Sequence, residues 1–117
     1  MGSLLEFEIK VIQGVQVYFL EGKLWGSLLK LLKKSVQDLA NQGDNLIIFD
    51  LSKVEDADSA GLGFLIGLMT TLESAGGRLA ICNVQSSLEG VLGLMSIPLI
   101  GTVDEALADI EGEGKQK

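Results

Sequence analysis

Two apolar runs joined by a helical segment constrain the fold of this chain more than any other pattern. Residues 46–51, LIIFDL, are almost continuously apolar, as expected for a strand that is covered on both faces of a sheet. A polar loop over 52–58 follows, then a predicted helix over 59–74 that ends before Gly76-Gly77, and then a second apolar strand over 79–84. This order predicts one βαβ unit with parallel strands and a right-handed crossover.

The residues before this unit predict a hairpin and a helix. Residues 7–12 and 15–20 are β-rich, and Gly14 between them can supply the positive φ of a two-residue turn. Ser27 is expected to cap the helix, and Gly43 suits the left-handed position that ends it. The apolar residues at helical spacing are Leu28, Leu31, Leu32, Val36 and Leu39.

The carboxyl-terminal part predicts three short elements and a tail. A helix is expected over 87–95, stopped before Pro98, and a short strand over 99–101. Thr102 and Glu105 form a capping box for a last helix that runs through Ile110. The final residues, 112–117, are polar and are expected to be disordered.

Length and composition favour one domain. The chain has 117 residues, 47% of them hydrophobic, which is enough for a core without disulfides or metal. We therefore expect a single α/β domain over 1–111, with a mixed sheet that combines an amino-terminal hairpin and parallel strands joined by helices. The longest apolar stretch, 60–69, is half the roughly 20 residues of a membrane span, and no secretion signal is evident, so membrane insertion is not expected and the predicted location is cytoplasmic.

Composition also excludes several classes of function. The chain has no histidine, which removes Ser-His and Cys-His catalysis and zinc sites built on imidazole. A net charge of -7 disfavours nucleic acid as a partner, and Lys30, Lys33 and Lys34 are interpreted as a solvated helix face. The one cysteine, Cys82, lies in an apolar run and is expected to be buried.

Function in open α/β sheets collects where strands end and helices begin. Here that segment is 55–63, with Asp56, Asp58 and Ser59 at the predicted start of the second helix. Three interpretations stay open: ordinary helix capping, a catalytic or metal role, and a regulated serine. No second cluster completes a mechanism, so we expect neither an enzyme nor a metal site or cofactor. The candidate partner-binding residues are Trp25, Asp56, Asp58, Ser59, Ala60, Gly61, Leu62 and Gly63.

Two features of these residues carry alternatives of their own. Gly61 and Gly63 resemble the start of a dinucleotide fingerprint, but position 66 is isoleucine where the third glycine is needed. Small residues instead allow the helix to approach the sheet, or a partner to approach the helix. Trp25 is the sole tryptophan, and both core burial and a role as an exposed interface anchor are open.

Three sequence blocks resemble those of the bacterial STAS domain, the family of anti-sigma factor antagonists, stressosome subunits and transporter-linked regulatory domains. The resemblance covers residues 7–110. The blocks are Asp50-Leu51-Ser52-Lys53-Val54, Asp58-Ser59-Ala60-Gly61-Leu62-Gly63 and Gly76-Gly77-Arg78-Leu79.

In the antagonist branch, the serine directly after the aspartate is phosphorylated by a partner kinase, and that position here is Ser59. The resemblance implies that the unphosphorylated chain binds an anti-sigma factor with serine kinase activity of the GHKL type, that phosphorylation dissolves the complex, and that a serine phosphatase resets it. The chain departs from the family at Trp25, where an aspartate is usual. An alternative is therefore a constitutive binding subunit of a stressosome or a lipid-transport ATPase complex. The oligomeric state is left open, a homodimer included.

The physical chemistry of Ser59 supports a switch in binding. A phosphoserine brings about -1.5 to -2 charges to a helix end that carries roughly +0.5, so the fold should tolerate it. The same charge beside Glu55, Asp56 and Asp58 would repel a partner packed over residues 60–63. Binding, rather than folding, is expected to change.

Overall fold

A computed structural model describes residues 4–115, with the side chains of residues 4–110. Its centre is one five-stranded sheet in which the strands lie in chain order. The first two strands are antiparallel and every later pair is parallel, which confirms the predicted mixed sheet. The strands are β1 (Leu5–Ile12), β2 (Val15–Leu24), β3 (Leu46–Ala57), β4 (Arg78–Cys82) and β5 (Leu99–Ile100).

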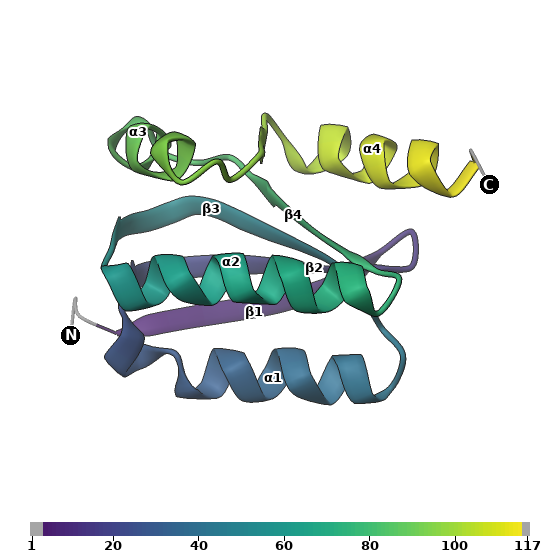
Figure 1. The fold of residues 1–117 in the computed structure, drawn as a ribbon, viewed down its shortest axis with the longest axis horizontal. Helices are drawn as coiled ribbons and strands as arrows, with labels where there is room; N and C mark the ends of the chain where they lie inside the picture. The colour runs from purple at the N-terminus through teal and green to yellow at the C-terminus, as the bar shows by residue number, and fades with distance from the viewer. Residues whose placement is uncertain (1–3, 116–117) are drawn as a thin grey trace.

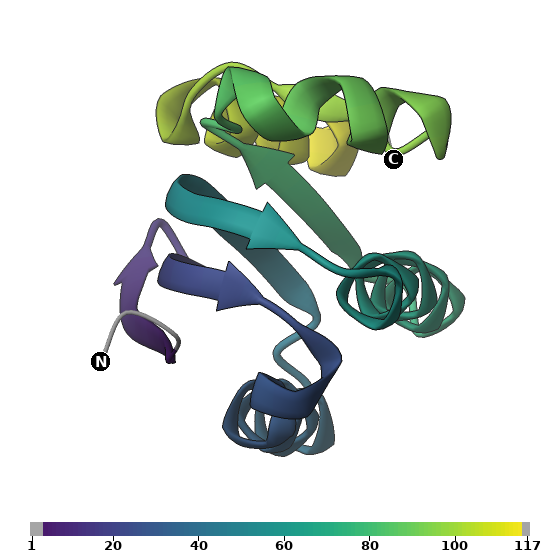
Figure 2. The same cartoon turned by 90° about the vertical axis from the view of Figure 1, so that its left-hand side faces the viewer.

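Helices cover both faces of the sheet (Figures 1 and 2). They are the 3-10 helix η1 (Gly26–Leu28) and the α-helices α1 (Lys30–Asn41), α2 (Ser59–Ser74), α3 (Ser86–Leu94) and α4 (Val103–Lys115). Leucines of α1, α2 and α3 pack into one core cluster, whereas α4 packs on the opposite face of the sheet. In the part of the chain that the structure describes, no helix is long and apolar enough to cross a membrane.

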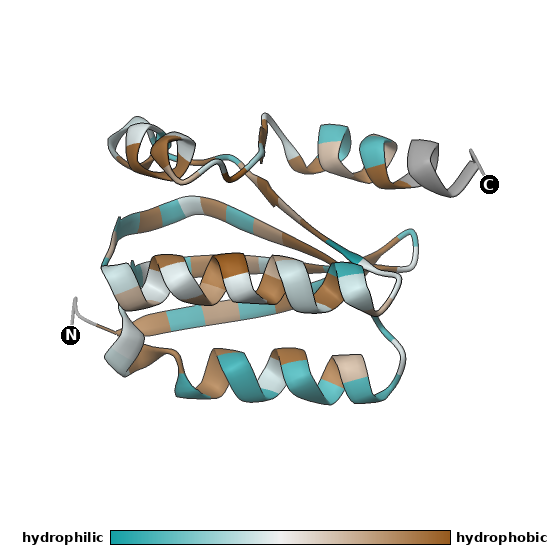
Figure 3. Cartoon of the chain, in the orientation of Figure 1, coloured by the Kyte–Doolittle hydropathy of each residue, from teal (hydrophilic) through white to brown (hydrophobic). Residues whose placement is uncertain are grey.

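Side chains of the central strands alternate between two cores, one on each face of the sheet. The larger core contains Tyr18 and Phe49, fully buried with ring centroids 5.3 Å apart. The smaller core packs Ile48 and Cys82 against α4, which confirms that the cysteine is buried. Figure 3 shows the difference between the covering helices: α1 alternates hydrophilic and hydrophobic residues, while α2 has few strongly hydrophilic ones.

The amino-terminal hairpin is confirmed. Ile12 pairs with Val15 across the turn, and Gln13 and Gly14 have φ values of 54° and 79°. Two consecutive positive φ values match a primed two-residue turn. Gly43, with φ of 87°, occupies the left-handed position expected after the first helix.

The prediction of a polar loop over 52–58 is wrong, because β3 continues as a strand to Ala57. The end of β2, which was also predicted to be shorter, pairs with this extension from Glu21 to Leu24. Two register shifts in β2 interrupt the ladder, and Gly22 adopts a φ of 115° between them. A shifted register breaks the period-two alternation, so the extension does not look like a strand in the sequence.

The predicted capping role of Ser27 is also wrong. Ser27 lies inside η1, and the residue before α1 is Leu29, which makes no side-chain cap. The turn of 3-10 helix follows from the Gly26 backbone, whose carbonyl accepts a hydrogen bond from Leu29 N at 3.4 Å. Lys30, Lys33 and Lys34 are exposed on α1, as expected for a solvated face.

Among the carboxyl-terminal elements, β4, α3 and β5 agree with the prediction within two residues, whereas α4 is longer than predicted. Strand β4 ends at Cys82, because Asn83 takes a left-handed φ of 54°. Thr102 Oγ1 accepts a hydrogen bond from Glu105 N at 3.1 Å, which confirms the helix cap. Helix α4 continues beyond the predicted end at Ile110, to Lys115. Residues 116–117 of the expected tail lie outside the described residues, and the domain boundary at 111 stays a prediction.

Candidate functional site

The candidate site lies where β2 and β3 end beside the start of α2. Leu24 pairs with Ala57 at the last rung of the parallel ladder, so the two strands end at the same edge. The chain after β2 turns into η1, and the chain after β3 turns into α2, and these two starts lie side by side (Figures 1 and 2). The extension of β3 therefore brings Trp25 to Asp56 and Gly26 to Asp58, although 31 and 32 residues separate them in the chain.

Asp58 joins the two segments. Its Oδ1 accepts hydrogen bonds from Gly61 N at 2.8 Å and from Gly26 N at 3.0 Å. Its own N–H donates to the Leu24 carbonyl at 3.3 Å. Asp58 is therefore the N-cap of α2, and it also fixes the loop that follows β2.

Two glycines allow this close approach. A Cβ added at Gly61 would lie 1.8 Å from the Leu24 carbonyl oxygen, and one at Gly26 would lie 2.5 Å from Ala60 Cβ. Neither position has room for a side chain unless the backbone moves. Gly63 differs, because it is exposed and no other atom lies within 4 Å of an added Cβ. Gly61 thus serves packing, while Gly63 leaves an open surface.

Ser59 is the first residue of α2 and is exposed. Because Asp58 provides the cap, the Ser59 hydroxyl is not needed for that role, and among the described residues it makes no hydrogen bond. The backbone N–H groups of Ser59 and Ala60 likewise have no acceptor in the described chain. These donors lie at the positive end of the helix dipole, where a bound negative charge is stabilised.

Trp25 combines both interpretations that the sequence left open. The residue is half-buried, and its Nε1 donates to Asp56 Oδ2 at 2.9 Å. The Lys23 ammonium lies 4.6 Å from the centroid of the indole ring, within the range of a cation–π contact. The ring is held in place from two sides and remains partly accessible beside Ser59.

The structure brings the eight predicted binding residues together but does not expose all of them. Gly61 and Leu62 are buried, with Leu62 in the main core, so they position the site instead of contacting a partner. The accessible residues are Trp25, Asp56, Asp58, Ser59, Ala60 and Gly63.

Three residues of the site were missed by sequence reasoning: Lys23, Leu24 and Gly26. Leu24 and Gly26 act mainly through backbone groups, which every residue carries, so no side-chain pattern could reveal them. No sequence motif predicts that Lys23 contacts Trp25, the aromatic residue two positions later. Within the described residues, no group of three or more acidic or cysteine side chains is placed to hold a metal ion.

The Cys82 thiol is remote from this site and is not activated. Burial raises the pKa of Cys82 to about 12, and the nearby charge of Asp50 acts in the same direction. A thiol with such a pKa is protonated near neutral pH and is a poor nucleophile. Asp50 is itself buried, and its carboxylate accepts hydrogen bonds from Ser52 N at 2.8 Å and Asn83 Nδ2 at 2.9 Å.

The chain belongs to the STAS domain family, whose model matches residues 6–109. A relative from Thermotoga neapolitana, named as an anti-sigma factor antagonist homologous to TM1081, is 31% identical over 111 residues, which cover 91% of this chain and 98% of the relative. The family resemblance seen in the sequence is confirmed.

Solved structures agree with this assignment. The NMR structure of TM1081 superposes with a TM-score of 0.80 at 29% identity, over 91% of this chain and 89% of that one. The anti-sigma factor antagonist SpoIIAA in its unphosphorylated form gives a TM-score of 0.78 at 22% identity, over 92% of this chain and 97% of that one, which shows a shared fold.

Proposed function

We propose that this chain is a cytoplasmic anti-sigma factor antagonist that is switched off by phosphorylation of Ser59. The observation that carries the proposal is the division of roles at the start of α2: Asp58 makes the helix cap, and the exposed Ser59 hydroxyl is left without a structural bond. The names of relatives from Thermotoga neapolitana and Paenibacillus polymyxa, both anti-sigma factor antagonists, support the same function.

The proposed partner is an anti-sigma factor that is also a serine kinase of the GHKL type. It would lie over the accessible edge formed by Trp25, Ser59, Ala60 and Gly63. Gly63 lets a partner backbone approach α2 closely, since nothing occupies the space beside it. A half-buried tryptophan beside such a surface is typical of a binding hot spot.

Transfer of the ATP γ-phosphoryl group to Ser59 Oγ places a dianion at this edge. The free N–H groups of Ser59 and Ala60 and the helix dipole can accommodate that charge within the chain. For a partner the effect is the opposite, because the phosphate adds to the exposed carboxylates of Glu55, Asp56 and Asp58. A bound partner would then lose contact area and face like-charge repulsion. A serine phosphatase would restore binding.

The proposal is tested by phosphotransfer. The chain is incubated with ATP and each purified GHKL-type kinase encoded by the source genome, and the product is mapped by mass spectrometry. We expect one phosphate, at Ser59, and none on the Ser59→Ala variant. Ser86→Ala is a matched control, because Ser86 is also an exposed serine at the first position of a helix. Phosphate at another residue, or none with any kinase, would contradict the proposal.

A second candidate function rests on Trp25, which stands where the family usually has an aspartate. The indole N–H of Trp25 donates a hydrogen bond to the Asp56 carboxylate. This part of the edge therefore offers an aromatic surface to a partner. That arrangement favours a constitutive binding subunit in a stressosome or a lipid-transport ATPase complex. Co-purification with such an assembly, unchanged by Ser59→Asp and lost with Trp25→Ala, would select this function over the first.

A further inference from the structure

The strand β1 forms an open edge of the sheet. Its only neighbour in the sheet is β2, and no helix lies beyond its outer side in the described chain (Figure 2). An exposed edge strand offers a row of backbone donors and acceptors to another strand. This edge is separate from the site at the start of α2.

The hairpin fixes which residues offer these groups. Ile12 and Val15 flank a two-residue turn and therefore form a hydrogen-bonded pair. Because such pairs alternate along an antiparallel ladder, the even-numbered residues of β1 bond to β2. Phe7, Ile9 and Val11 direct their N–H and C=O groups away from β2, toward the open edge.

The same three residues present apolar side chains on the face covered by α1. Ile9 and Val11 are 37% and 64% exposed, and Leu31 on α1 is 70% exposed. Phe7, Ile9 and Leu31 line one shallow hollow between the strand and the helix. This apolar strip lies directly beside the unpaired backbone groups, so a strand added to β1 would cover both.

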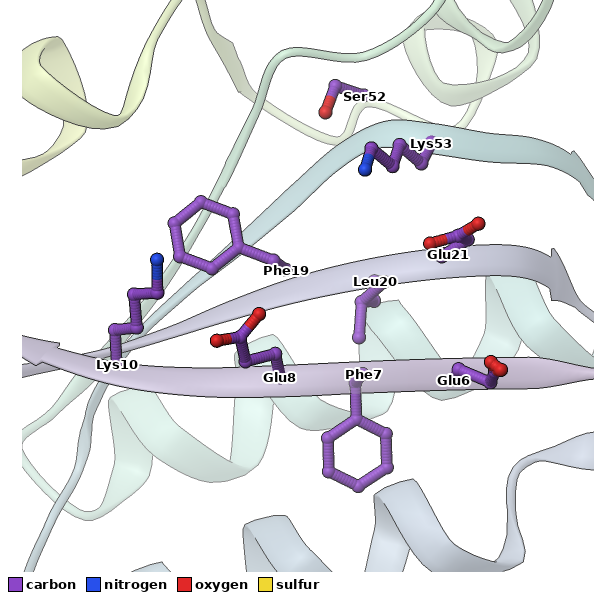
Figure 4. A pocket seen from close by; sticks show the side chains of 9 residues that line it. All are labelled: Glu6, Phe7, Glu8, Lys10, Phe19, Leu20, Glu21, Ser52 and Lys53. Atoms are coloured by element: carbon purple, nitrogen blue, oxygen red, sulfur yellow. The ribbon is translucent and has the colours of Figure 1, made fainter.

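The opposite face of β1 carries charges that the chain itself does not pair. Figure 4 shows Glu6, Glu8 and Lys10 on one side of the strand and Phe7 on the other. None of the three charged side chains has a salt bridge with another described residue, and the Lys10 ammonium lies 5.4 Å from the centroid of the Phe19 ring. The order of charges about Ile9 is negative on one side and positive on the other.

We propose that β1 pairs antiparallel with β1 of a second copy of this chain, about a twofold axis at Ile9. In this register Ile9 faces Ile9 of the second copy as a hydrogen-bonded pair, which matches the outward direction of its backbone groups. Glu8 then faces Lys10 of the second copy, and Lys10 faces its Glu8, so two opposite-charge pairs form. On the other face, Phe7 and Val11 of the two copies meet and cover the apolar strip.

Neighbouring registers are less favourable. The backbone pattern requires odd residues to face odd residues, so the nearest alternatives place the axis at Glu8 or at Lys10. An axis at Glu8 sets Glu8 opposite Glu8 of the second copy, although it also sets Lys10 opposite Glu6 twice, and an axis at Lys10 sets Lys10 opposite Lys10. Only the axis at Ile9 gives two opposite-charge pairs and no like-charge pair. Charge complementarity therefore selects the axis at Ile9 and identifies the occupant as a second copy of β1.

The charge pairs give the first test, measured by sedimentation equilibrium of the full chain from micromolar to millimolar concentration. We expect a reversible dimer. Glu8→Lys alone and Lys10→Glu alone each place like charges opposite one another twice, and each should weaken self-association about tenfold or more. A mixture of these two variants, or the double variant, restores opposite charges and should restore the dimer. An axis at Glu8 or Lys10 predicts no such rescue in the double variant.

A cysteine scan gives the second test. Ile9→Cys places two thiols directly across the axis and should form a disulfide-linked dimer readily, whereas Glu8→Cys and Lys10→Cys should do so much more slowly. The native thiol contributes little background because Cys82 is buried. Ile9→Lys should abolish dimerisation, and Ile66→Lys is the matched control, since Ile66 is also 37% exposed but lies on α2.

A chain that stays monomeric at millimolar concentration would overturn the proposal, as would a dimer that survives Ile9→Lys. A dimer that is lost in Ile66→Lys but kept in Ile9→Lys would place the interface on α2 and would also overturn the proposal. Each variant is first checked for an unchanged circular dichroism spectrum and melting curve. None of these results depends on phosphorylation, so failure here leaves the proposed function of Ser59 untouched.

Discussion

At the start of α2, one carboxylate serves two backbone segments. Asp58 caps the helix through Gly61 N and holds the loop after β2 through Gly26 N. A cap is worth about 1 kcal/mol, and a second donor left without a partner costs about as much again. The residue that precedes the candidate phosphorylation site therefore sets its position.

We predict that Asp58→Ala lowers the free energy of unfolding by about 2 kcal/mol, measured by urea denaturation. Asp58→Asn is the matched variant, because its carbonyl oxygen can accept both hydrogen bonds and asparagine caps helices as well as aspartate. It should stay within about 0.5 kcal/mol of the parent chain. Equal stability of the alanine and asparagine variants would show that the two hydrogen bonds contribute nothing.

The glycines of α2 make a second prediction, because two of them differ in the space beside them. A Cβ at Gly61 would collide with the Leu24 carbonyl, whereas Gly63 is open. Gly61→Ala should destabilise the chain by about 1–3 kcal/mol through overpacking. Gly63→Ala should stabilise it by about 0.5–1 kcal/mol through helix propensity, and should weaken partner binding if α2 is the docking surface. The same denaturation experiment measures both, and like signs for the two variants would contradict this account of the packing.

Among the secondary-structure elements, β4 is covered by helices on both faces, and this shields Cys82. The thiol pKa rises from its usual 9.0 to about 12 in the folded chain. Burial also raises the pKa of Tyr18, although its hydrogen bond with Ser35 opposes the rise. Both groups hold their protons more tightly in the folded state than in the unfolded state.

The contribution of these two groups to stability should therefore be fully present below about pH 9 and be lost as the pH rises from about 9 toward 12, where the unfolded chain loses protons that the folded chain retains. Urea unfolding at a series of pH values measures this slope. Cys82→Ala should flatten it, and comparison with the parent at each pH corrects for the lost sulfur contacts. A thiol reagent should label Cys82 only as fast as the chain unfolds, and rapid labelling of the folded chain would contradict its burial.

The sequence predicted an element correctly where its apolar residues follow a regular local period. The hairpin, the βαβ unit and the helix that begins at Ser59 follow from turn residues and apolar runs, and all are confirmed. The second half of β3 was missed because two register shifts in β2 disturb the alternation, and Val54 is buried between exposed neighbours on both sides. Ser27 was assigned a cap because serine at a helix start usually is one, but the backbone forms η1 there.

The sequence predicted which segment forms the candidate site, but it did not predict the contacts that this segment makes. Asp58-Ser59 at a helix start could be placed at the sheet edge from the order of elements alone. Its contact with Trp25 and Gly26 depends on the missed extension of β2 and β3, which brings the two loops together. The burial of Gly61 and Leu62 likewise follows from the approach of α2 to Leu24, which no local pattern reports.

The whole molecule is compact, with a radius of gyration of 13.3 Å, close to the value expected for a single domain of this length. The two proposed binding surfaces lie at different places on the sheet. The carboxyl ends of β2 and β3 carry the proposed regulatory edge, and β1 carries the proposed self-association edge. A dimer through β1 would leave Ser59 of each copy accessible, so one assembly would present two switchable sites.

The central claim is that a phosphate on Ser59 changes partner binding without changing the fold, and one calorimetric measurement tests it directly. The chain is prepared with serine or with phosphoserine at position 59, and each form is titrated with the GHKL-type kinase that phosphorylates it, in the absence of ATP. Repulsion of several kcal/mol predicts that phosphoserine weakens binding by about 100-fold or more, while the free energy of unfolding stays within about 0.5 kcal/mol. Equal affinity of the two forms would contradict the account.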